Sequence, residues 1–74
     1  MKNVKESVQE LYQDKVVREF YDSIKEGSNA DEAYNDAVIF ARGISDGGAY
    51  VGFNYDFVKC ISVLSSVYES EVNK

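Results

Sequence analysis

Apolar residues recur at helical spacing over three stretches of the chain, and glycines separate these stretches. They span about residues 3–26, 28–43 and 54–72. Positions three and four residues apart share one face of an α-helix, so each stretch predicts an amphipathic helix. The chain contains no proline, which leaves glycines and capping side chains to end the helices. We therefore expect an all-α fold in a single domain over residues 1–74, a small three-helix domain with a glycine-rich loop before the last helix.

The first stretch leaves open whether it forms one helix or two. Its apolar positions fall into two stripes, namely Val4, Val8, Leu11 and Tyr12, and then Val17, Phe20, Tyr21 and Ile24. At about 100° per residue the stripes are offset by well over a quarter turn. We favour one long helix that packs on two neighbours, capped by Asn3 and ended by Gly27 in a left-handed conformation. The alternative is a break near Gln13 with Asp14 as a new cap, which gives four helices.

The second and third helices carry clear capping signals. Ser28 or Asn29 is expected to cap the second helix, which then runs for about 14 residues and ends at Arg42-Gly43. Asn54 or Asp56 is expected to cap the third. Its apolar stripe comprises Phe57, Cys60, Ile61, Leu64, Val67 and Tyr68.

Residues 43–53 form the segment of most unusual composition, because four glycines alternate with apolar residues. We expect a loop whose apolar side chains pack into the core, and a β-hairpin over residues 44–53 is the competing local structure. Gly47 and Gly48 could present backbone N–H groups to a phosphate, with Arg42 and Lys59 as the nearest cations. The segment lacks the Walker and dinucleotide patterns, so binding of an anionic ligand or nucleotide by an oligomer is an alternative interpretation only.

Composition argues against catalysis. The chain has no histidine, which removes the usual general base near neutral pH and any Cys/His zinc site within one chain. Cys60 has no internal disulfide partner and lies on an apolar stripe, where a buried structural role is expected. We therefore expect no enzyme activity, catalytic residue, cofactor or metal site. No apolar stretch follows the first lysines, and the unpaired cysteine suits a reducing compartment, so a cytoplasmic location is expected.

Charge points to the class of partner. Eight basic and thirteen acidic residues give a net charge of −5, which disfavours direct binding to nucleic acid or to anionic membranes. From Glu19 to Asp36, six acids accompany a single base, Lys25. These acids are either a solubilising surface or a contact surface for a basic partner. The candidate partner-binding residues are Asp22, Glu26, Asp31, Glu32 and Asp36, together with Tyr50 and Tyr55 beside the glycine-rich segment.

Our leading functional hypothesis is a protein–protein interaction module. In its most concrete form the chain is a small inhibitor or antagonist, of the kind that mobile elements or phages encode. It would occupy a basic site on a nucleic-acid-handling protein by imitating nucleic-acid phosphates. A structural subunit that assembles into a homo-oligomer is a further alternative, because so small a core often needs association for stability.

Overall fold

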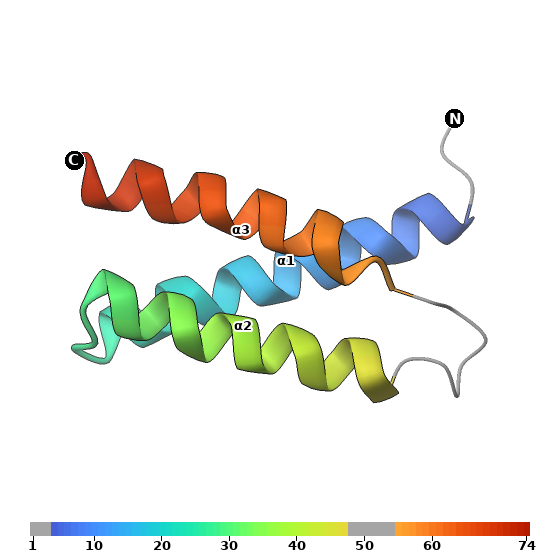
Figure 1. The fold of residues 1–74 in the computed structure, drawn as a ribbon, viewed down its shortest axis with the longest axis horizontal. Coiled ribbons are helices and arrows are strands. Elements are labelled where there is room, and N and C mark those ends of the chain that lie inside the picture. The colour runs from blue at the N-terminus through green and yellow to red at the C-terminus, as the bar shows by residue number, and fades with distance from the viewer. Residues whose placement is uncertain (1–3, 48–54) are drawn as a thin grey trace.

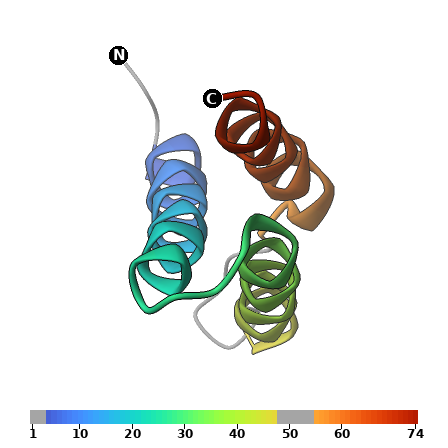
Figure 2. The same ribbon diagram turned by 90° about the vertical axis from the view of Figure 1, so that its left-hand side faces the viewer.

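The computed structural model describes residues 4–47 and 55–74, and these residues form three α-helices. Helix α1 spans Val4–Lys25, α2 spans Ala30–Gly47 and α3 spans Phe57–Val72. The helices run alternately in opposite directions along the long axis (Figure 1) and form a triangle when seen from one end (Figure 2). No described residue belongs to a strand. The predicted all-α class and the three helices are confirmed.

Helix α1 is continuous through Gln13 and Asp14, so this stretch forms one helix. Its buried face runs along Tyr12, Val16 and Phe20, each one turn from the next. The two predicted stripes were therefore wrong in part. Leu11 and Tyr21 are 62% and 42% exposed, whereas Val16, which neither stripe included, is fully buried. Val16 joins Tyr12 to Phe20 on one face, so the helix does not have to change face along its length. The predicted cap Asn3 lies outside the described residues.

The turn between α1 and α2 is built as the local sequence predicts. Gly27 takes a φ of 108°, which L side chains rarely adopt. The Ser28 N–H donates to the Ser23 carbonyl and the Gly27 N–H to the Ile24 carbonyl, each at 3.0 Å, which is the Schellman pattern at a helix C-terminus. Asn29 is the cap of α2, since its Oδ1 accepts from the backbone N–H of Glu32 at 2.9 Å.

The predicted end of α2 at Gly43 is wrong, because the helix continues to Gly47. Ile44 packs against the core one turn after the buried Ala41, and this contact favours continuation of the helix past Gly43. Gly43 lies on the exposed side, where glycine weakens a helix but does not end it. A hairpin that begins at Ile44 is therefore excluded. The rest of the predicted loop, with Gly48 and Tyr50, lies outside the described residues.

Helix α3 begins as predicted. Asp56 is its cap, and the Asp56 Oδ1 accepts from the Lys59 backbone N–H at 2.9 Å. Cys60 and Leu64 are buried, and the remaining apolar positions of the predicted stripe are partly buried against them. The predicted stripe of this helix is therefore confirmed.

Alanines supply the α2 share of the core. Ala33, Ala37 and Ala41 have no exposed surface and cluster with larger side chains of α1 and α3, including Phe20 and Leu64. Small side chains let helix backbones approach closely, so α2 can pack against both neighbours at once. Within the described residues, no helix has the length and apolar character needed to cross a membrane.

Candidate functional site

Three helix termini meet at one end of the bundle, which we call the turn end. It holds the C-terminus of α1, the N-terminus of α2 and the C-terminus of α3 (Figure 1). Asp22 and Glu26 approach it along α1 and the following turn, Asp31 and Glu32 leave it along α2, and Glu69 lies near the end of α3. Sequence reasoning grouped the first four but missed Glu69, because only the antiparallel packing of α3 brings it to this end.

All five predicted acidic contact residues are exposed. Two of them have structural partners, since Asp31 accepts a hydrogen bond from Tyr68 and Glu32 takes part in the α2 cap with Asn29. The carboxylates of Asp22, Glu26 and Asp36 have no ion pair or hydrogen bond to any of the described residues. Asp36 lies further along α2 than the others. Three of the five predicted acids are therefore directed only to solvent.

Two of the three helix termini add to the negative charge of the turn end, and the N-terminus of α2 offsets part of it. The C-terminus of a helix carries a partial negative charge, and bases there are favourable whereas acids are not. Helix α3 has no base in its last turn, and α1 has Lys25 alone. Lys74 follows α3 and pairs with Glu71 at 3.1 Å. The acids of α1 and α3 thus lie where the helix dipoles oppose them, so their placement does not serve helix stability.

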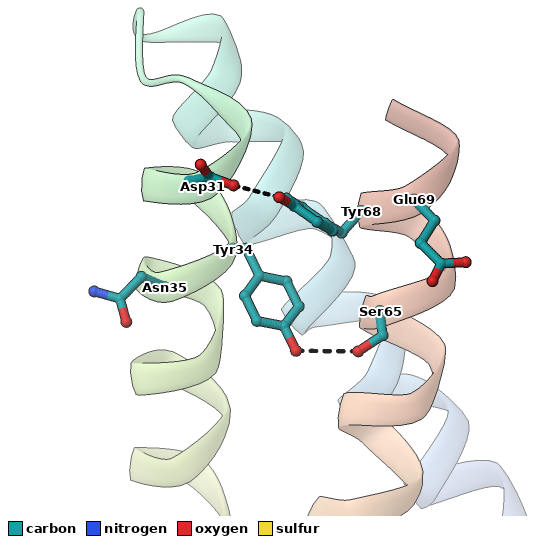
Figure 3. A pocket seen from close by; sticks show the side chains of 6 residues that line it. All are labelled: Asp31, Tyr34, Asn35, Ser65, Tyr68 and Glu69. Carbon is teal, nitrogen blue, oxygen red and sulfur yellow. Dashed lines mark hydrogen bonds between the residues drawn. The ribbon is translucent and has the colours of Figure 1, made fainter. Parts of the chain in front are cut away.

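A pocket of about 530 Å³ opens between α2 and α3 near the turn end (Figure 3). It is lined by Asp31, Tyr34, Asn35, Ser65, Tyr68 and Glu69. The two tyrosine rings lie between the helices with their centroids 5.1 Å apart, and Asn35 and Glu69 lie on opposite sides of them. Two carboxylates and no base line the pocket, which gives it a negative charge.

Two hydrogen bonds fix the tyrosines of this pocket. The Tyr34 hydroxyl and the Ser65 Oγ are 3.0 Å apart, and the Tyr68 hydroxyl donates to Asp31 Oδ1 (Figure 3). The bond to Asp31 raises the pKa of Tyr68, with partial desolvation as a second cause. Sequence reasoning found only Asp31 here. Tyr68 falls on the apolar stripe predicted for the third helix, and no local signal links it to Tyr34, so far away in the chain.

Of the two tyrosines predicted as partner contacts, Tyr50 lies outside the described residues and Tyr55 packs partly within the bundle. Tyr55 is half-buried, and its ring packs against the ring of Tyr12 with centroids 4.7 Å apart. Its carbonyl accepts a long hydrogen bond of 3.4 Å from Ser45. Much of Tyr55 is thus engaged within the bundle. Among the described tyrosines, Tyr21 has the most exposed side chain, and it lies on α1 on the approach to the turn end.

Of the predicted anion-binding residues, Gly47, Arg42 and Lys59 belong to the described part of the chain and Gly48 lies outside it. Gly47 is the last residue of α2, and the Arg42 guanidinium lies over the Phe57 ring, 5.6 Å from its centroid. The Lys59 backbone N–H, which a phosphate would need, already bonds the Asp56 carboxylate. That carboxylate also repels an anion at the start of α3, so this arrangement disfavours the ligand-binding alternative.

Buried polar groups at the other end of the bundle have structural partners. The Tyr12 hydroxyl donates to the Ala41 carbonyl at 2.9 Å. Burial is the main cause that raises the pKa of both Tyr12 and Cys60, so both groups stay protonated at neutral pH. Cys60 is buried, as predicted. No group of three or more acidic or cysteine side chains is placed to hold a metal ion within residues 4–47 and 55–74.

Comparisons of this chain with models of protein families, with curated proteins and with solved structures find no match.

Proposed function

We propose that this chain is a non-catalytic interaction module that binds a basic partner through its negative turn end. The observation that carries the proposal is the set of carboxylates at and near this end that have no partner among the described residues, with Asp22 and Glu26 as its centre. Like charges gathered on one surface repel each other and lower stability. A surface that works against folding is best explained by a gain made on binding.

The same surface supports the more specific form of the proposal, an inhibitor of a nucleic-acid-handling protein. Proteins that bind nucleic acid present lysines and arginines to phosphates. Exposed carboxylates at the turn end offer such a site an alternative set of negative charges, reinforced by two helix C-termini. Charge complementarity of this kind speeds association and makes it sensitive to salt.

A matched pair of variants tests this function. Asp22→Asn with Glu26→Gln removes two charges from the turn end, and Asp14→Asn with Asp46→Asn removes two exposed charges elsewhere. None of these four side chains bonds another described residue. Immobilised wild-type and variant proteins are used to capture proteins from a nuclease-treated lysate of the source cells. The Kd of each captured protein is then measured after purification, with and without a DNA duplex as competitor.

We expect the turn-end variant to bind a captured protein about tenfold more weakly, which corresponds to about 1.4 kcal/mol, and the control variant to bind as the wild type does. We also expect the DNA duplex to displace the wild-type chain. Equal binding by the two variants would refute the role of the turn end. Binding that DNA leaves unchanged would refute the inhibitor form of the proposal.

Exposed apolar side chains favour a second candidate function, self-assembly as a structural subunit. Leu11, Ile39 and Val58 are each more than 60% exposed. Light scattering behind a sizing column, over a range of protein concentrations, tests this candidate. A defined oligomer that Ile39→Ser dissociates would support it, and a monomer at every concentration would refute it.

A further inference from the structure

We propose that the pocket between α2 and α3 receives an arginine side chain of the basic partner. Its guanidinium would lie against the rings of Tyr34 and Tyr68 and bond the carboxylates of Asp31 and Glu69. The inference rests on the proposed function and deepens it, because it names the chemical group that is recognised and the residues that recognise it.

The pocket offers acceptors that nothing in the described chain uses. Asp31 accepts from Tyr68 through Oδ1, which leaves its second carboxylate oxygen available. The side chains of Glu69 and Asn35 bond no other described residue. Among the described residues the Tyr68 hydroxyl is the donor to Asp31, and it holds that carboxylate in place. Acceptors with negative charge, one of them held in position, favour a ligand that carries several donors and a positive charge.

The aromatic residues of the pocket lining favour a guanidinium over an ammonium group. The rings of Tyr34 and Tyr68 lie in the pocket between the helices (Figure 3), held by the bonds to Ser65 and Asp31. A planar guanidinium can pack against such a ring while its five N–H groups bond carboxylates at its edge. An ammonium group is smaller and more strongly hydrated, so it gains less from the rings. The described residues place no third acid where it could complete a metal site, which favours an organic cation.

Access to the pocket suits a side chain that enters from a partner surface. The pocket is open between two exposed helix faces, and its volume of about 530 Å³ exceeds what one guanidinium fills. The arginine stem can therefore pass over Tyr34 towards the partner, and the partner surface closes the remainder. The neighbouring acids of the turn end then meet further basic residues on the same partner.

The pocket can be tested without the partner. We would titrate the ¹⁵N-labelled chain with N-acetyl-arginine-N-methylamide and follow the backbone amide resonances. We expect saturating shifts, roughly in the millimolar range, at the six residues that line the pocket. The citrulline analogue, which has the same shape without the charge, should give no saturating shifts. The lysine analogue should bind several-fold more weakly.

Two variants complete the test. Glu69→Gln removes a pocket carboxylate, and Asp46→Asn removes an exposed α2 carboxylate outside the pocket. We expect Glu69→Gln to weaken binding of the arginine probe about threefold and Asp46→Asn to leave it unchanged. Small shifts that grow linearly at acids throughout the chain, or equal effects of the two variants, would overturn the proposal. Because no partner is present, saturable binding here would stand even if the turn-end variants failed to affect partner capture.

Discussion

For the substitution Gly43→Ala, the sequence and the structure predict changes in stability of opposite sign. A glycine that ends a helix takes a positive φ, where replacement by alanine is costly. The structure places Gly43 inside α2, exposed, with helix continuing for a further turn to Gly47. At such a position alanine is preferred, because glycine loses more backbone entropy on folding. We therefore expect Gly43→Ala to stabilise the domain.

The magnitude follows from the surroundings of the new methyl group. Apart from its chain neighbours and the nearby backbone of its own helix, no atom of the described residues lies within 4 Å of a Cβ built on Gly43, so the substitution adds neither packing nor strain. The gain should then be the intrinsic preference of a helix for alanine, about 0.5–1 kcal/mol. For a domain of this size that corresponds to a rise in Tm of about 5 °C.

Gly27→Ala is the matched control, because it makes the same chemical change at a glycine of opposite conformation. Gly27 is also exposed, and its Cβ would also meet nothing within 4 Å, but its φ is +108°. We expect this variant to lose roughly 1–2 kcal/mol. Urea and thermal unfolding, followed by far-UV circular dichroism, would measure both variants. Destabilisation by Gly43→Ala would refute the continuous α2 and return the helix end to Gly43.

Three further predictions test the core and its polar groups. Tyr12→Phe should cost about 1 kcal/mol in urea unfolding, because it removes the buried bond to the Ala41 carbonyl; a stability equal to that of the wild type would contradict the role of this bond. Ala37→Leu should cost about 1–3 kcal/mol, because the alanine has no exposed surface and α2 would have to move away from its neighbours; a stability gain would show that the core holds unfilled space. Stability should fall with rising alkalinity, because Cys60, Tyr12 and Tyr68 have pKa values raised in the folded state. The folded chain holds these protons more tightly, so the stabilisation is complete below the ordinary pKa values of 9.0 and 10.0 and is lost as the pH rises above them. Urea midpoints measured at neutral pH and at about pH 10 would check this, and a midpoint independent of pH would contradict it.

Features that depend on a few neighbouring residues were predictable from the sequence. Gly27, Asn29 and Asp56 act on backbone groups no more than five positions away, so their types and spacing suffice to place two helix starts and one helix end. The stripe of α3 was also predictable, because its apolar residues are regularly spaced and its polar positions are clear. Local signals of this kind account for the confirmed helices.

The end of α2 and the face of α1 depend on packing between helices. Glycine is a residue type that often ends a helix, but at Gly43 the burial of Ile44 against the core outweighs this tendency. Val16 and Val17 are adjacent valines, and composition does not say which one faces inward. The answer comes from the neighbours, since only Val16 completes the line between Tyr12 and Phe20. These errors arose where tertiary contacts decide between two locally acceptable conformations.

The candidate pocket could not be predicted from the sequence, because it also depends on packing between helices. Its two hydrogen bonds join residues 31 and 37 positions apart, and both require the register between α2 and α3. Asp31 could be singled out from charge alone. Its partner Tyr68 could not, because a tyrosine on an apolar stripe is expected to pack into the core, and Tyr68 is indeed partly buried against the core.

Charge repulsion among the acids at the turn end matters because the core of this domain is small. Few side chains of the described residues are fully buried, and three of those are alanines, so the bundle has little stability to spare. A protein selected only for stability would place a base at the C-terminus of α3, as Lys25 is placed at that of α1, because bases there lower the energy. The chain instead leaves α3 without a base in its last turn and places Glu69 beside the pocket. A basic partner would reverse this repulsion on binding, so the charges that weaken the free domain are those that would stabilise the complex.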